Sequence, residues 1–198
     1  MSVAGSKRGS VAEVVTVGVL SDTHGRLYPR VREVLEGVDH IIHAGDVGSP
    51  EVLAELATIA PVTAVRGNCD HEAWARTLPL HAEVELGGTR ILVGHIARKL
   101  PEAAKTTIQA GEAGQTRPDH GFAVVITGHS HVARVEKRDG VLYLNPGSAG
   151  PRRLGQPRTV ARLEIRTSRA GELNALPQVS GEILAAEATI PVYRLLAT

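Results

Sequence analysis

The sequence predicts an α/β protein in which strands alternate with helices. Two observations carry this prediction. Short apolar runs rich in β-branched residues alternate with helical segments through the first half of the chain, and polar residues follow most of these runs. Such spacing is typical of βαβ units with right-handed crossovers and a parallel sheet. The 198 residues suffice for one core, so we expect one domain over 11–198 behind a loose tail at 1–10.

The first half of the chain contains three expected strands and two expected helices. In order they are a strand at 14–20 (VVTVGVL), a helix at 29–35, a strand at 40–45 (HIIHAG), a helix from 49, and a strand at 62–67 (VTAVRG). The second helix is expected to begin at Ser49, an N-cap residue, with Pro50 at the first helical position. Its apolar face is expected to consist of Val52, Leu53, Leu56 and Ile59.

The second half is richer in strands. The expected elements are a hairpin of 82–86 and 89–93, a helix at 101–109, a polar loop at 112–120, a strand at 122–127, a hairpin over 133–145, and strands at 159–166 and 188–195. Gly87-Gly88 and Asp139-Gly140 are the expected hairpin turns, because such pairs readily adopt positive φ.

Charge and cysteine content narrow the classes of partner. The net charge of +1 comes from positive and negative residues spread along the chain. The electrostatic field of the protein therefore does not indicate binding to nucleic acid or to an anionic membrane. Cys69 is the single cysteine, which excludes an internal disulfide and suits a reducing cytoplasm. No stretch approaches the roughly 18 apolar residues that a membrane span needs. We expect a cytoplasmic protein with a small-molecule partner, and a homo-oligomer stays open.

Seven polar side chains follow the ends of five expected strands. They are Asp22, His24, Asp46, Asn68, His95, His129 and His131. In open α/β sheets ligands gather beyond the carboxyl ends of the strands, so these side chains are expected to converge on one crevice. Each of these residues could by itself be a turn or capping residue. Polar ligand-type residues after five strands in one chain favour one shared site instead.

The types of these residues favour a metal centre. Imidazole nitrogens with carboxylate and amide oxygens, without thiolate, suit manganese, iron, zinc or cobalt better than calcium or magnesium. Seven ligands are too many for one tetrahedral ion, whereas two ions sharing one carboxylate would use them all. We expect two divalent ions, with manganese as the first choice and iron, zinc, cobalt or nickel as alternatives.

The order of short motifs resembles the calcineurin-like metallophosphoesterase superfamily. The motifs are D-T-H (22–24), G-D (45–46), G-N-C-D (67–70), G-H (94–95) and G-H-S-H (128–131). The later L-N-P-G-S (144–148) is similar to the small bacterial and archaeal phosphodiesterase branch. The resemblance implies two mixed β-sheets packed face to face between helix layers, an α-β-β-α sandwich, with a dinuclear site at the edge of the sheets.

The resemblance also implies how the ligands are shared. One ion would be held by Asp22, His24, Asp46 and His131, and the other by Asp46, Asn68, His95 and His129, so that Asp46 bridges. Such a pair of ions acidifies a shared water to hydroxide and neutralises charge on the phosphoryl oxygens. Asn68 can also offer an amide proton to the phosphate. The expected activity is metal-dependent hydrolysis of a phosphoester, with a phosphodiester as the first choice.

Three features depart from the superfamily's pattern. Cys69 stands where many members have a histidine that helps to protonate the leaving group, and His71 is a candidate replacement. Ala97 stands where the small branch often has a second histidine. The segment 103–120 lacks the apolar periodicity of a long helix.

Residues around the expected site are assigned weaker roles. A phosphate could be held by Arg66, Arg152 or Arg153, and Ser148 is a low-ranked candidate for reaching the site. The turn Asn145-Pro146-Gly147 is expected to support the metal ligands.

Two other functions stay open. In a subunit of the retromer sorting coat the superfamily's fold serves as an interaction scaffold with degenerate metal ligands, so a non-catalytic, metal-binding scaffold is the main alternative. The seven intact ligand positions favour catalysis. A nucleotide-binding regulator is the other alternative, but no G-x-G-x-x-G follows the first strand.

Overall fold

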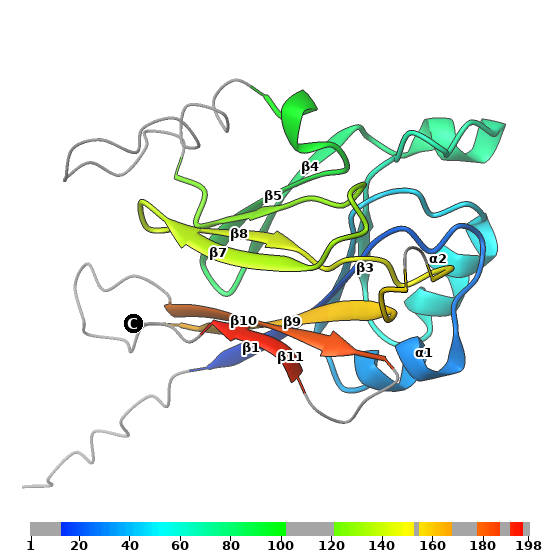
Figure 1. Ribbon diagram of the computed structural model, residues 1–198. Coiled ribbons are helices and arrows are strands. Elements are labelled where there is room, and N and C mark those ends of the chain that lie inside the picture. The colour runs from blue at the N-terminus through cyan, green and yellow to red at the C-terminus, as the bar shows by residue number, and fades with distance from the viewer. Residues whose placement is uncertain (1–12, 102–120, 153–154, 168–177, 187–190, 196–198) are drawn as a thin grey trace, which may run out of the picture.

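Two mixed β-sheets face each other in the computed structural model (Figure 1). The structure describes residues 13–101, 121–152, 155–167, 178–186 and 191–195, so the tail expected at 1–10 and nearly all of 101–120 lie outside the described residues. The helices are α1 (Pro29–Leu35), α2 (Pro50–Ala57) and the short 3₁₀ helices η1 (Ala73–Thr77) and η2 (Ala97–Lys99). The strands are β1 (Val14–Leu20), β2 (His40–His43), β3 (Val62–Ala64), β4 (His81–Leu86), β5 (Thr89–Gly94), β6 (Val124–Ile126), β7 (Arg134–Arg138), β8 (Val141–Asn145), β9 (Thr159–Arg166), β10 (Gln178–Ala185) and β11 (Pro191–Leu195).

The first sheet has the strand order β11-β10-β9-β1-β2-β3. Strands β1, β2 and β3 pair in parallel, as the alternation with helices predicts. The parallel prediction is incomplete, because β9 pairs antiparallel with β1, and β10 and β11 continue the sheet antiparallel. Strand β10 was not predicted. Its sequence QVSGEILA has Gly181 in the middle and a weak apolar pattern, so its pairing with β9 determines its conformation.

The second sheet has the order β4-β5-β6-β8-β7. Two hairpins, β4-β5 and β7-β8, flank β6 and pair with it in parallel through β5 and β8. Both hairpins turn at the predicted Gly87-Gly88 and Asp139-Gly140 pairs. The predicted pair of mixed sheets is therefore confirmed.

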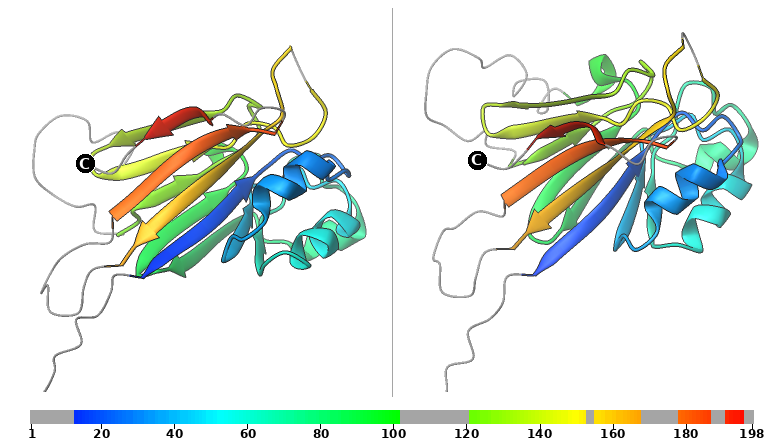
Figure 2. Two further views of the ribbon diagram at one scale, coloured as in Figure 1. Left: turned by 90° about the horizontal axis from the view of Figure 1, so that it is seen from below. Right: turned by 60° about the horizontal axis from the view of Figure 1, so that its bottom comes forward.

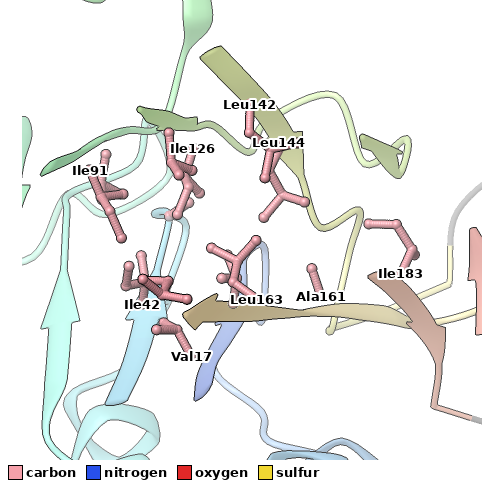
Figure 3. Packing of buried hydrophobic residues seen from close by; sticks show 14 of the residues in the cluster. Val17, Ile42, Ile91, Ile126, Leu142, Leu144, Ala161, Leu163 and Ile183 are labelled. Atoms are coloured by element: carbon pink, nitrogen blue, oxygen red, sulfur yellow. The ribbon is translucent and has the colours of Figure 1, made fainter. Parts of the chain in front are cut away.

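The main core lies between the two sheets (Figure 3). Its largest fully buried side chains are Ile42, Leu163 and Ile165 from the first sheet, and Ile91, Ile126 and Leu144 from the second. Burying one such side chain stabilises the fold by about 1.5–3 kcal/mol. Close packing of this kind also fixes the strand ends of one sheet relative to those of the other.

Helices α1 and α2 lie against the outer face of the first sheet (Figure 2). Leu35 of α1 approaches β1 closely, because Gly18 has no side chain: a Cβ there would lie 2.5 Å from Leu35 Cδ2. Ser49 is at the N-cap of α2 as predicted, but its hydroxyl bonds to the Glu51 side chain and not to a backbone amide.

A second helix layer, on the outer face of the second sheet, is not found among the described residues. That face carries a small buried cluster of Leu92, Leu100, Phe122, Val125 and Val141, and η2 is the nearest helical segment in sequence. Within the described ranges, no helix has the length and apolar character needed to cross a membrane.

Candidate metal centre

The seven predicted ligands converge where strands of both sheets end. Five of them are His24, Asp46, Asn68, His129 and His131, which line a cavity of about 580 Å³ together with Cys69 and Ser130. The other two lie behind its wall, where Asp22 contacts His131 and His95 contacts Asp46. Five of the seven side chains therefore share one crevice, and the other two lie against them.

The backbone at this site adopts an unusual conformation. Five of the predicted ligands have φ between 49° and 68°: Asp22, His24, Asp46, His129 and His131. Asp139, in the β7-β8 turn, is the one further described residue other than glycine with positive φ. Side chains disfavour this left-handed region, and residues held in it cluster at functional sites. The fold accepts local strain in order to aim these side chains into the cavity.

Asp22, His24 and His131 form one group of candidate ligands. Their ligand atoms lie within 4.8 Å of one another, and His131 Nε2 is 3.1 Å from Asp22 Oδ1. The rings of His24 and His131 stack with their centroids 5.4 Å apart. Asp22 is fully buried, and this burial raises its pKa to about 6. A carboxylate in such a place gains from a nearby cation.

A second group gathers around His95. Its Nε2 lies 3.1 Å from Asn68 Oδ1 and 3.3 Å from Asp46 Oδ2, and its ring meets that of His129 edge-on with 5.3 Å between centroids. His95 Nδ1 lies 2.7 Å from the carbonyl oxygen of Ala44. Because a carbonyl can only accept, Nδ1 carries the hydrogen. Burial lowers the pKa of His95, but hydrogen bonds to Asp46 and Ala44 outweigh it and raise the pKa above its usual value. Nε2 therefore faces acceptor oxygens in the cavity, and a metal ion would take the place of its hydrogen.

Asp46 lies next to both groups. Its ligand atoms fall within 4.8 Å of those of Asp22 and His95 on one side, and of His24 and Cys69 on the other. Burial raises the pKa of Asp46, but hydrogen bonds from His95 and from the Cys69 backbone amide at 2.7 Å outweigh it, and the pKa lies well below its usual range. A Cβ at Gly67 would come within 2.1 Å of Asp46, so this close fit requires glycine.

The donor set fits two divalent ions. Four imidazoles, two carboxylates and one amide face a common space, a mixture that suits manganese, iron or zinc. Asp22 Oδ1 is buried and accepts no hydrogen bond from the described residues. The group Asp22-His24-His131 contains three of the four ligands predicted for one ion, while Asp46 also forms a group with Asp22 and His95, which were predicted for different ions. The individual ligand roles stay predictions.

Asp70 supports this arrangement and was missed as a functional residue. Its buried carboxylate accepts hydrogen bonds from the backbone amides of Val47 (3.2 Å), Gly48 (2.8 Å) and Gly67 (2.8 Å). It thereby ties the loop after β2 to the loop after β3, the loops that carry Asp46 and Asn68. The motif G-N-C-D contained this carboxylate, but only the fold shows that its partners are backbone amides.

Two further polar residues brace the ligand loops. His43 is fully buried, with Nε2 2.9 Å from Thr23 Oγ1, and Thr23 Oγ1 donates to the Val47 carbonyl at 2.9 Å. Burial lowers the pKa of His43 to about 4, so the ring is neutral. Asn145 Nδ2 donates to the Gly128 carbonyl at 2.7 Å. This contact confirms the prediction that Asn145 supports the ligand loop.

The remaining predicted residues lie in different places. Cys69 is exposed and lines the cavity, and Asn68 Nδ2 donates to its Sγ at 3.3 Å. His71 is exposed, and it is not among the described residues that line the cavity. Ser148 Oγ donates to the Asp22 carbonyl at 3.3 Å and so supports the loop from behind.

The predicted phosphate-binding arginines are not brought to the cavity. Among the described lining residues neither Arg66 nor Arg152 occurs, and Arg153 lies outside the described ranges. Two cations of η2 act on one of the predicted ligands. Burial and the neighbouring His95 lower the pKa of His129, and the charges of Arg98 and Lys99 lower it further.

Comparison with known proteins agrees with the motifs. The sequence profile of the calcineurin-like phosphoesterase superfamily domain matches residues 15–168. A probable metallophosphoesterase of Methanothermobacter thermautotrophicus is 32% identical over 71% of this chain and 81% of its own. A phosphodiesterase of Methanocaldococcus jannaschii is 29% identical over 66% of this chain and 82% of its own. Vacuolar protein sorting 29 from Cryptosporidium parvum, a solved structure, superposes with a TM-score of 0.68 over 92% of this chain and 98% of its own, and its 19% identity supports the fold alone.

Proposed function

Because the chain belongs to the calcineurin-like phosphoesterase superfamily, we propose that it is a phosphodiesterase that works with two divalent metal ions. Manganese is the first choice of metal, and iron, zinc, cobalt and nickel are the alternatives. The observation that carries the proposal is the position of Asp46 between two sets of candidate ligands. A shared carboxylate is what a two-ion phosphoryl-transfer site requires.

Each side chain at the site has a definite task in this proposal. Two bound cations would supply an acidified water as nucleophile and neutralise charge on the phosphoryl oxygens. Asp46, kept anionic by its hydrogen bonds, holds the two ligand sets together. His95 donates from Nδ1 to the Ala44 carbonyl, which orients the ring so that Nε2 would face a bound ion. Asn68 Nδ2 donates to Cys69 Sγ in this structure, and it can donate to a phosphoryl oxygen when that hydrogen bond is replaced.

Similarity to a protein named as a phosphodiesterase supports a diester as substrate. Two properties of the chain support a cytoplasmic location and a small-molecule partner: its single cysteine and its net charge of +1. A membrane or nucleic-acid partner forms no part of the proposal.

The test is a screen of metal-free protein reloaded with each candidate metal. The substrates are bis(p-nitrophenyl) phosphate, p-nitrophenyl phosphate, alkyl monoesters and cyclic nucleotides. We expect metal-dependent turnover of the diester that exceeds turnover of the monoesters. Faster hydrolysis of monoesters would contradict the substrate class and leave the metal site intact as a hypothesis.

A non-catalytic metal-binding scaffold of the same fold is the second candidate. The same screen separates the two functions. A scaffold would bind metal ions with full occupancy and hydrolyse none of the phosphoesters. Occupancy measured on the assayed sample therefore decides between a scaffold and an enzyme that merely lacks metal.

A further inference from the structure

A second hollow lies directly beside the metal cavity. This side groove, of about 590 Å³, is lined by residues of η2, of the loop after β6 and of β7. His129 and Ser130 line both spaces, so the groove and the cavity share a wall. A group attached to a phosphate in the metal cavity therefore has a direct path into the groove. Ala97, whose side chain is only a methyl group, lines the groove and leaves it open.

Two arginines that are distant in sequence line the same groove. Arg98 comes from η2 and Arg134 from the start of β7, and both are exposed. No ion pair among the described residues involves Arg98. Arg134 Nη2 lies 2.6 Å from Glu136 Oε2, and the Arg134 side chain is 67% exposed, so its remaining guanidinium hydrogens can reach a ligand. Among the described residues that line the groove, Arg98 and Arg134 carry positive charge and none carries a carboxylate.

Polar groups complete the lining. Ser130 Oγ receives a hydrogen bond from Asn145 Nδ2 at 3.1 Å, which holds the shared wall in place. Thr127 adds a second hydroxyl. Arginine forks with hydroxyl groups recognise phosphate oxygens well, because planar guanidinium donors match the spacing of the oxygens.

We propose that the side groove binds a second phosphate of the substrate, carried on the part of the phosphodiester that does not react. The inference rests on the proposed function and deepens it: the preferred substrate is a phosphodiester that bears a further phosphomonoester. Arg98 and Arg134 bind that phosphate, and neither residue contacts the reacting phosphorus.

The test compares two substrates that release the same leaving group. They are thymidine 5′-(p-nitrophenyl phosphate) and its 3′-phosphorylated derivative. With wild type we expect kcat/KM to be roughly tenfold higher for the 3′-phosphorylated compound, through a lower KM, and the advantage to shrink as salt rises. Arg98→Gln and Arg134→Gln should each reduce this advantage about threefold, the double variant should abolish it, and the parent compound should be cleaved as before.

A binding measurement runs beside the kinetics. Calorimetry on metal-loaded protein compares thymidine 3′,5′-bisphosphate with thymidine 5′-monophosphate, and the bisphosphate should bind more tightly in wild type only. Arg30→Gln, the same charge change on α1 away from the groove, is the matched control and should behave as wild type. Equal affinity for both nucleotides in wild type would overturn the inference, and so would an advantage that survives in the double variant. If the protein hydrolysed neither substrate but still bound the bisphosphate more tightly, the proposed function would be wrong and the anion site in the groove would stand.

Discussion

The two sheets contribute different chemistry to the same site. Strands β1, β2 and β3 of the first sheet end in the oxygen donors Asp22, Asp46 and Asn68, with His24 as the one imidazole. Strands β5 and β6 of the second sheet end in His95, His129 and His131, which are all imidazoles. Neither edge alone has the donors for two ions. The centre therefore depends on the interface that packs one sheet against the other.

The two carboxylates after β1 and β2 differ in exposure from the two histidines after β6. Asp22 and Asp46 are 0% and 2% exposed, whereas His129 is exposed and His131 is 13% exposed at its side chain. The carboxylates are thus held deep in the fold by fixed partners, and the imidazoles of β6 form the rim. A substrate is expected to approach over the second sheet, the side on which the arginine-lined groove lies.

The largest effect is expected for the carboxylate between the two groups. Asp46→Asn should bind neither ion firmly and lose several orders of magnitude in kcat, because each ligand set loses its shared anion. Elemental analysis and turnover of bis(p-nitrophenyl) phosphate measure this. Asp139→Asn is the matched control, since Asp139 shares the positive φ but lies in the β7-β8 turn. An Asp46→Asn protein with two ions and near-normal turnover would disprove the bridging role.

The rim histidines test whether the second sheet serves both ions. His131 contacts Asp22, and His129 contacts His95, so they are assigned to different ions. His129→Ala and His131→Ala should each lower the bound metal from about two ions towards one, and the double variant should approach none. Unchanged stoichiometry in both single variants would show that these histidines are not ligands.

The burial of Asp22 at the edge of the first sheet can be tested by measuring the free energy of unfolding. The pKa of Asp22 is about 6 in the folded protein and 3.8 in the unfolded chain, so the folded state holds the proton more tightly. The stability that protonated Asp22 contributes is therefore complete below pH 3.8 and is lost as the pH rises through 6. In metal-free protein Asp22→Asn should therefore become more stable than wild type as pH rises from 4 to 7, by up to about 3 kcal/mol. Added manganese should reverse the order, since only the carboxylate binds it well.

Denaturant unfolding of both proteins, with and without manganese, measures these differences. The asparagine carbonyl oxygen can still accept the hydrogen bonds that the Ser21 hydroxyl and the His129 amide (3.2 Å) donate to Asp22 Oδ2, so loss of the charge is the main change. A pH-independent difference in metal-free protein would show that the buried carboxylate carries no electrostatic cost.

The smallest effect concerns the leaving group. Cys69 lines the cavity, and a thiol is a weak hydrogen donor, so esters with low-pKa leaving groups should be cleaved far faster than alkyl esters. Cys69→His should improve only the poorer substrates, by roughly tenfold. His71→Ala is the control and should match wild type. A flat leaving-group dependence in wild type would mean that another acid already acts there.

The sequence predicted the positions of the ligands better than it predicted their support. The carboxyl ends of parallel strands lie at one edge of a sheet, so residues after β1, β2 and β3 had to lie together. Gly87-Gly88 and Asp139-Gly140 indicated the turns of the two hairpins. Strand β10 escaped prediction because pairing with β9, and not its own pattern, holds it. Asp70 and His43 act through backbone and hydroxyl partners that are distant in sequence. Arg98 and Arg134 line one groove only because the fold brings η2 and β7 to the same side of the site.

The most direct test of the account is a titration of metal-free protein with manganese in which bound ions and turnover of bis(p-nitrophenyl) phosphate are measured on the same samples. Two ions shared through Asp46 should bind per chain, and turnover should appear only as the second ion binds. Full turnover with one ion per chain would contradict the shared two-ion site. Two bound ions without turnover would contradict the enzyme itself.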